Sequence, residues 1–170
     1  RRGLMQVYCP SLTQYQRWET RCVMIGNVGV GGDNPIRIQS MTTTNTMDTE
    51  GTIAQSIRMI EAGCEIVRIT APSINEAKNL KPIRDSIRAR GFNTPLVADI
   101  HFTPNAAAVA AAIVEKVRIN PGNYADRKKF ETHDYSDQSY SEELERIKDR
   151  FMPLVRICKG NGTAMRIGTN

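Results

Sequence analysis

Short runs of β-branched and apolar residues alternate with stretches of helical period along most of this chain. The five runs have the length and composition of buried strands. Between them, apolar residues recur three and four positions apart, as on amphipathic helices. Because strands and helices alternate, we expect an α/β domain with a parallel sheet. The predicted strands are Pro35–Ser40, Ile66–Thr70, Pro95–Ile100, Lys116–Asn120 and Ala164–Gly168.

Each of the four helices predicted between the strands carries a start or stop signal. The first ends at Gly63, because a residue without a Cβ atom can adopt the left-handed conformation that closes a helix. The third begins at Pro104, where an N–H group is not needed. The second and fourth begin with a serine followed three residues later by a glutamate, which is a capping box. These pairs are Ser73 with Glu76 and Ser139 with Glu142.

Three further stretches fall outside this alternation. Residues 1–21 form an N-terminal extension that lacks the continuous apolar segment of a signal peptide. Residues 22–34 contain β-prone residues around several glycines, which predicts a hairpin leading into the first strand. Residues 124–140 are polar and without a period, so we expect a surface insertion in which His133 is solvated.

The composition is that of one soluble globular domain. Of 170 residues, 40% are apolar and 24% are charged, and the net charge of +5 favours anionic partners. Aromatic residues make up only 6%, which argues against a nucleic-acid-binding module that stacks bases on aromatic side chains. The longest apolar run, Ala106–Val114, has nine residues, whereas a membrane span needs roughly 20. We therefore expect neither nucleic acid nor a membrane as a partner.

The cysteines indicate free thiols in a reducing cytoplasm. Cys9, Cys22, Cys64 and Cys158 are far apart in the sequence, with no C-x-x-C pair and no spacing suited to zinc. A disulfide pair is the alternative that the spacing leaves open.

Four of the five strands share a unit of an apolar residue, arginine, isoleucine and a small or polar residue. The third strand has Asp99 and His101 instead. Because successive strand residues point to opposite faces, the charged side chains lie opposite the apolar ones. Helices must cover the apolar face, so the charged face is the interior if the sheet is part of a (β/α) barrel. The arginines are Arg37, Arg68, Arg118 and Arg166.

This charged face predicts a pocket for an anion. Withdrawing an unpaired guanidinium from water costs on the order of several kcal/mol, and the one carboxylate of Asp99 cannot offset four arginines. A guanidinium also meets two phosphate oxygens at once. The alternative is that the arginines pair with acids on neighbouring helices or point outward at strand ends. Asp99 and His101 share a face and either serve a ligand hydroxyl or a proton transfer, or orient the arginines.

The chain contains, in order, Ile38-Gln39-Ser40-Met41-Thr42, Val67-Arg68-Ile69, Leu96-Val97-Ala98-Asp99-Ile100-His101-Phe102, Val117-Arg118-Ile119-Asn120-Pro121-Gly122-Asn123 and Arg166-Ile167-Gly168-Thr169-Asn170. From about residue 20 to 170, these motifs resemble the 4-hydroxy-3-methylbut-2-enyl diphosphate synthases, iron–sulfur oxidoreductases of the non-mevalonate isoprenoid pathway. That resemblance implies a TIM-type barrel. It also implies the substrate 2-C-methyl-D-erythritol 2,4-cyclodiphosphate, which such enzymes reductively open to 4-hydroxy-3-methylbut-2-enyl diphosphate.

The resemblance also implies roles for individual residues. Asp99 and His101 are expected beside the substrate ring and its hydroxyl groups, as the catalytic pair. Arg37 is left out, because relatives often carry an apolar residue there. The residues expected to hold the diphosphate are Arg68, Arg118, Asn120, Arg166 and Asn170.

The resemblance places the [4Fe-4S] cluster in a separate C-terminal domain, with ligands outside this chain and flavodoxin or ferredoxin as the electron donor. We therefore expect residues 22–170 to be the first five strand–helix units of a (β/α)₈ barrel, preceded by the hairpin, without its remaining strands or iron–sulfur domain. Such a fragment should be inactive alone, and it should either associate, with a homodimer as one candidate, or be marginally stable. A dihydropteroate-synthase-like transferase barrel, which also binds a diphosphate, is the alternative.

Overall fold

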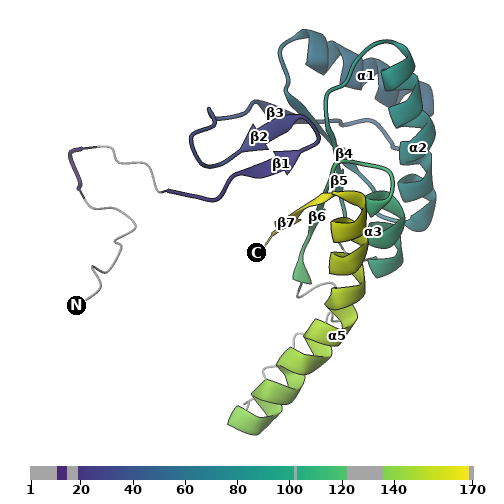
Figure 1. The fold of residues 1–170 in the computed structure, drawn as a ribbon. Coiled ribbons are helices and arrows are strands. Elements are labelled where there is room, and N and C mark those ends of the chain that lie inside the picture. Colours follow the sequence, from purple (N-terminus) through teal and green to yellow (C-terminus); the bar gives the residue numbers. More distant parts are fainter. Residues whose placement is uncertain (1–10, 15–18, 102, 122–135, 169–170) are drawn as a thin grey trace.

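The chain folds into a five-stranded parallel sheet with helices on one face and a two-stranded hairpin on the other (Figure 1). The computed structural model describes residues 11–14, 19–101, 103–121 and 136–168. The expected α/β architecture and hairpin are confirmed. In chain order, the elements are β1 (Val23–Ile25), β2 (Val28–Val30), β3 (Gln39–Met41), α1 (Thr49–Glu61), β4 (Ile66–Thr70), α2 (Ile74–Ala89), β5 (Leu96–Asp99), α3 (Pro104–Ala111), β6 (Lys116–Ile119), α5 (Asp137–Asn161) and β7 (Ala164–Ile167).

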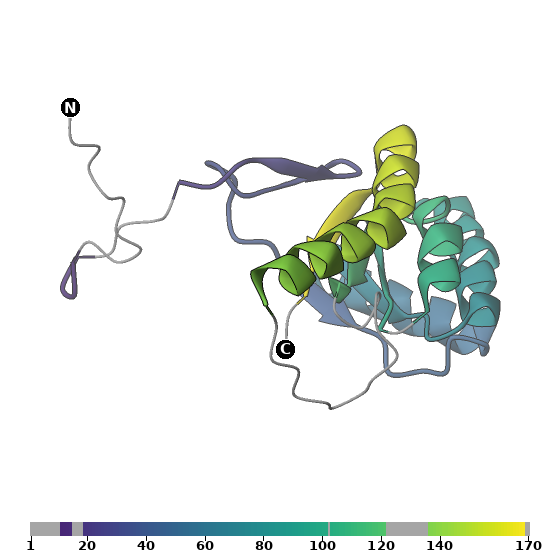
Figure 2. The same ribbon diagram turned by 90° about the horizontal axis from the view of Figure 1, so that it is seen from below.

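The sheet has the order β3-β4-β5-β6-β7, so each strand pairs in parallel with the next one along the chain. This is how the wall of a (β/α) barrel is built. Seen from below, the helices form the outer layer of this wall, and the hairpin lies on the other side of the sheet (Figure 2). Within the described residues, β3 and β7 each pair on one side only, so the sheet is open. No described helix combines the length and apolar character that would let it cross a membrane.

The main core lies between the helices and the outward side of the sheet. Val67 and Ile69 of β4 are fully buried there, because alternate residues of a strand share one face. Leu96 and Ala98 of β5 occupy the same layer. The helices contribute a stripe of buried residues that includes Ile53, Leu80, Ile83, Ile87, Leu154 and Cys158. With these positions facing outward, the intervening strand residues must face inward.

The hairpin covers the N-terminal end of the inward face. Ile25 of β1 packs there against Ile66, Val97 and Ala164, the inward-facing apolar residues nearest the starts of their strands. Its tight turn uses Gly26 with a φ of 56°, a conformation that favours glycine. The hairpin thus plugs one end of the inner space, which leaves the other end for polar side chains.

The expected first strand, Pro35–Ser40, is wrong over residues 35–38. The strand that forms is β3, and Ile36 is 85% exposed. Arg37 lies outside the strand, where its Nη1 pairs with Glu65 Oε1 at 2.8 Å and its Nε donates to the Gly29 carbonyl at 2.8 Å. The second oxygen of Glu65 accepts from the Ile38 N–H at 2.8 Å. This segment is therefore tied to the hairpin and to the start of β4.

The last described helix starts before the predicted capping box. The side chain of Ser136 caps α5 by accepting a hydrogen bond from the Ser139 N–H at 3.2 Å, so Ser139 lies inside the first turn. Residues 137–140 of the expected surface insertion are consequently helical. Residues 122–135, with His133, lie outside the described residues.

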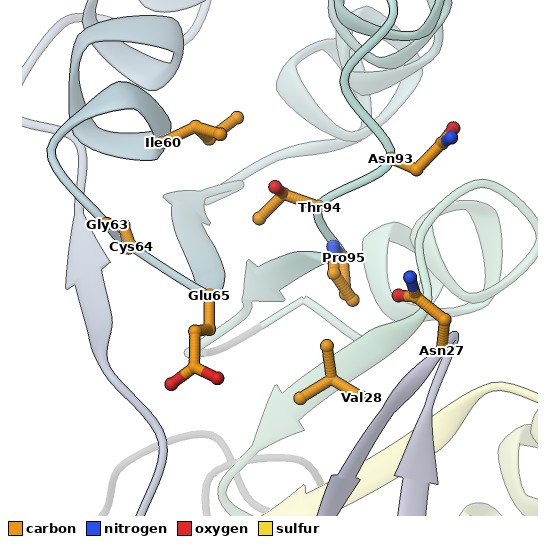
Figure 3. A pocket seen from close by; sticks show the side chains of 9 residues that line it. All are labelled: Asn27, Val28, Ile60, Gly63, Cys64, Glu65, Asn93, Thr94 and Pro95. Carbon is orange, nitrogen blue, oxygen red and sulfur yellow. The ribbon is translucent and has the colours of Figure 1, made fainter.

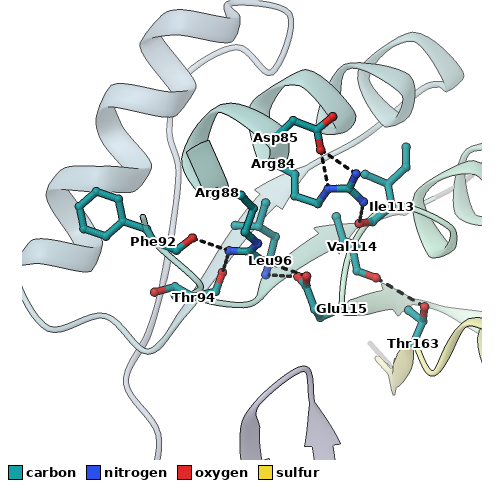
Figure 4. Close-up of polar contacts among 10 residues, drawn as sticks. All are labelled: Arg84, Asp85, Arg88, Phe92, Thr94, Leu96, Ile113, Val114, Glu115 and Thr163. Carbon is teal, nitrogen blue, oxygen red and sulfur yellow. Dashed lines mark hydrogen bonds and ion pairs between the residues drawn. The ribbon is translucent and has the colours of Figure 1, made fainter. Parts of the chain in front are cut away.

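Polar contacts fasten α2 to the starts of two strands (Figure 4). Nη1 of Arg88 donates to the carbonyls of Phe92 and Thr94, both at 2.9 Å. Nη2 of Arg88 pairs with Glu115 Oε1 at 2.9 Å, and Glu115 Oε2 accepts from the Leu96 N–H at 2.8 Å. One arginine and one glutamate thus fix the N-terminal ends of β5 and β6, away from the polar end of the sheet.

Replacing Arg88 with alanine is expected to destabilise the fold by about 1–3 kcal/mol, because it strands a partly buried carboxylate and two carbonyls. Urea unfolding measures the change. The matched control is Arg90→Ala, since Arg90 reaches Glu50 only at 3.7 Å on an exposed surface. Equal midpoints for the two variants would contradict the structural role given to Arg88.

Candidate functional site

The polar inward-facing residues of β4, β5 and β6 lie on the same face of the sheet as the hairpin, beyond the part that the hairpin covers. Arg68 lies on β4, Asp99 ends β5, and Arg118 lies on β6. Asp99 is the register partner of Arg118, which in turn is the partner of Arg166 on β7. The strand alternation that buries Ile69 and Ala98 against the helices turns these charged side chains inward.

A single buried carboxylate is shared by two arginines. Asp99 is 1% exposed, and its Oδ2 lies 2.5 Å from Arg68 Nη2. Its Oδ1 lies 3.5 Å from Arg118 Nη1. A buried carboxylate is stable only when it is paired and hydrogen-bonded, and here two strands supply the partners. Asp99 therefore orients both guanidinium groups from between them.

His101 completes this network from the segment after β5. Its Nε2 lies 3.0 Å from Asp99 Oδ2, and its Nδ1 lies 3.3 Å from Arg118 Nη1. A guanidinium has only donors, so Nδ1 must accept and the ring proton belongs on Nε2, which donates to Asp99. The geometry thus favours the tautomer with its proton on Nε2, and Nδ1 of the ring accepts from Arg118.

One basic residue of this face, Lys116, is not among the site residues predicted from the sequence. It lies two residues before Arg118 on β6 and so points to the same side. Burial lowers the pKa of Lys116, and the positive charges of Arg166 and Arg68 lower it further. The same two-residue alternation that selected the arginines could have identified it.

The remaining predicted residues differ in how directly they join this network. Arg166 is exposed on β7, beside Arg118. Asn120 is buried just after β6, at the end of the sheet where Asp99 lies. Asn170 lies outside the described residues. Arg37 is excluded from the network by its pairing with Glu65, an acid between α1 and β4 and not, as the alternative expected, on a neighbouring helix.

Positive charge exceeds negative charge on this face. Among its described side chains, four are basic and one, Asp99, is acidic; the basic ones are Arg68, Lys116, Arg118 and Arg166. In addition, Nε of Arg68 is buried without a hydrogen-bond partner in the described structure. A buried donor without a partner carries a penalty that an acceptor would remove. The arrangement suits a ligand with several anionic oxygens.

The described residues do not supply a metal or cluster site. They contain no group of three or more His, Cys, Asp or Glu side chains that could hold a metal ion. Cys22 is exposed, whereas Cys64 and Cys158 are buried. The Sγ atom of Cys64 lies 3.0 Å from the Ile66 carbonyl, and burial raises the pKa of the Cys158 thiol. The iron–sulfur cluster implied by the resemblance therefore does not fit these residues.

A separate open pocket of about 390 Å³ lies at the opposite end of the strands, next to the hairpin turn (Figure 3). Its one charged lining residue is Glu65, whose carboxylate is paired with Arg37. The pKa of Glu65 is lowered by the hydrogen bond from the Ile38 backbone and then by Arg37. This pocket therefore offers no unpaired charge among its lining side chains.

Comparisons with known proteins agree with the geometry. The family described as "GcpE TIM-barrel domain" matches residues 20–170. Relatives from Akkermansia muciniphila, Parabacteroides distasonis and Leptospira interrogans are 57%, 55% and 56% identical over 96%, 92% and 92% of this chain. Each of them is named 4-hydroxy-3-methylbut-2-en-1-yl diphosphate synthase (flavodoxin). The chain covers 28%, 26% and 24% of their respective lengths. With its inward-facing arginines on the first strands of a barrel wall, this chain belongs to the GcpE TIM-barrel domain family.

Proposed function

We propose that this chain is the part of a 4-hydroxy-3-methylbut-2-en-1-yl diphosphate synthase barrel that binds the diphosphate of 2-C-methyl-D-erythritol 2,4-cyclodiphosphate. The observation that carries this proposal is the excess of inward-facing basic residues, Arg68, Arg118, Arg166 and Lys116, over the single carboxylate of Asp99, which pairs with Arg68 and Arg118. Lys116 begins β6, whereas Asp99 ends β5 near the strand C-termini, where TIM-type barrels place their sites. The names of the relatives support a diphosphate compound as the ligand.

The two guanidinium groups on Asp99 are proposed to grip the diphosphate. Each presents more donors than one carboxylate can use, so both can bind phosphate oxygens without leaving Asp99 unpaired. Arg166 is exposed and can turn towards the ligand, and Asn120 and Asn170 are proposed to donate amide hydrogens. The positive charge that is uncompensated in the free chain becomes the source of affinity.

Asp99 and His101 are proposed to serve the ring end of the substrate. Asp99 already accepts from Arg68 and His101, so we assign it the orientation of both the arginines and the imidazole. His101 is proposed to contact a ring hydroxyl and to take or hold a proton at Nδ1. That nitrogen becomes accessible only when Arg118 moves from it towards the diphosphate.

The whole reaction requires parts that this chain does not provide. We propose a two-electron reductive ring opening with loss of a hydroxyl group, carried out by the longer protein with a [4Fe-4S] cluster that residues outside this chain hold. Flavodoxin is the proposed electron donor, as the names of the relatives state for those enzymes. Three free thiols among the described residues suit a reducing cytoplasm. The family match favours this function over a dihydropteroate-synthase-like transferase.

Substituting Arg118 or Arg166 with alanine is expected to weaken binding of the cyclodiphosphate by about tenfold or more each. Each charged hydrogen bond to phosphate contributes about 1.5 kcal/mol or more. Calorimetric titration of the longer protein that continues past Asn170 measures the loss. Arg37→Ala is the matched control, because Arg37 is engaged by Glu65 and Gly29 away from the site, and it should bind normally. Unchanged affinity in both test variants would remove the site assignment.

Replacing Lys116 with methionine is expected to weaken ligand binding while stabilising the ligand-free fold, because it removes a partly buried cation that faces two others. The pKa of Lys116 is lowered from its usual 10.5, so the folded state binds this proton less readily than the unfolded state. The penalty is full below the folded-state pKa and fades as the pH rises through that value towards 10.5.

Urea unfolding across alkaline pH checks this prediction. In the unsubstituted protein the lysine should add a rise in the free energy of unfolding as the pH approaches 10.5, and Lys116→Met should lack that rise. Lys148→Met is a control from an exposed helix position, where hydrogen bonding to Glu145 instead raises the lysine pKa. Identical pH profiles for the unsubstituted protein and Lys116→Met would show that folding does not lower the pKa of Lys116.

A further inference from the structure

Gly168, the residue that follows β7, lies directly against the guanidinium group of Arg118. Its N–H continues the pairing of β6 and β7 by donating to the Ile119 carbonyl at 2.8 Å. A Cβ atom built at Gly168 would lie within 2.8 Å of three guanidinium atoms of Arg118, namely Nε, Nη2 and Cζ. Carbon atoms do not approach other heavy atoms this closely, so a side chain at this position and the observed Arg118 cannot coexist.

The backbone itself does not require glycine here. Gly168 is absent from the glycines with positive φ, so its conformation is open to other residues. Six other glycines of the described chain, in contrast, have left-handed φ values. The need for glycine at position 168 therefore comes from the space that the Arg118 side chain occupies.

Polar contacts with Asp99 and His101 hold the guanidinium of Arg118 in the described structure. Its side chain is 14% exposed, and its Nη1 contacts His101 Nδ1 at 3.3 Å and Asp99 Oδ1 at 3.5 Å. The backbones of β6 and β7 are fixed to each other by their ladder. A methyl group on residue 168 would therefore be accommodated by moving the flexible end of Arg118 and disturbing its contacts with Asp99 and His101.

We propose that Gly168 is a positioning residue that sets the place of the Arg118 guanidinium in the anion site. This inference rests on the proposed function, and it adds a residue that makes no polar side-chain contact of its own. The absence of a side chain lets the guanidinium lie flat on β7 while its outer edge faces His101 and Asp99. Binding of an anion by Arg118 then depends on the absence of a side chain at position 168.

A double-mutant cycle tests the proposal in the longer protein, with the cyclodiphosphate titrated calorimetrically. Arg118→Ala should weaken binding by about tenfold or more. Gly168→Ala should reproduce most of that loss, and the double variant should bind no more weakly than Arg118→Ala alone, because both changes act through one side chain. Gly160→Ala is the matched control, since a Cβ atom there meets nothing within 4 Å, and it should bind normally.

Two further measurements separate positioning from a general structural role. Nitrogen-15 NMR of the His101 ring should show a changed Nδ1 signal in Gly168→Ala, because Arg118 no longer faces that atom. The thermal unfolding midpoint of this variant should stay close to that of the unsubstituted protein. A large fall in the midpoint, with loss of binding and of folded NMR signals, would overturn positioning in favour of a structural role.

The outcomes distinguish this inference from the function on which it rests. If Arg118→Ala binds the cyclodiphosphate normally, the proposed function is wrong. If Arg118→Ala weakens binding but Gly168→Ala does not, or if the two losses add fully in the double variant, the proposed function stands and only the role of Gly168 is overturned.

Discussion

The carboxylate of Asp99 is the interaction on which the rest of this site depends. It is almost completely buried, and it pairs with Arg68 on one neighbouring strand and with Arg118 on the other. Ala98, the residue before Asp99 on β5, faces the helices and is buried in the main core. Its packing in the outer layer therefore fixes the inward direction of Asp99. Because a one-residue slip in a strand exchanges its two faces, the same register of β5 buries Ala98 and turns Asp99 towards Arg68 and Arg118.

The described inner face of this sheet carries more positive than negative charge. Burial lowers the pKa of Lys116 there, and the positive charges of Arg166 and Arg68 lower it further. The opposite end of the sheet is built differently, because Arg88 there is matched by Glu115 and by backbone carbonyls. Charges that hold the starts of the strands are thus neutralised locally, whereas basic residues outnumber acidic ones among the described side chains of the inward face.

Strand positions were predictable where alternation alone decides them, and β4 has the predicted bounds. Alternation also selected Arg68, Asp99 and Arg118. It could not show that both arginines contact the carboxylate of Asp99, because Arg68 and Arg118 are 31 and 19 residues from Asp99 in sequence. Arg37 carries the same local motif and still lies outside the strand, because Glu65, distant in sequence, captures it. Gly168 gave no signal beyond its place in a motif, since its role depends on the volume of a side chain from another strand.

The hairpin gives the inner space a floor. Ile25 packs against Ile66, Val97 and Ala164 at the end where the strands begin. The described inner face is therefore covered at that end and uncovered at the C-terminal ends of the strands. Within the described residues, an approach to Arg118 therefore begins at the C-terminal ends of the strands or across the open edges of the sheet, and not from the side of the hairpin.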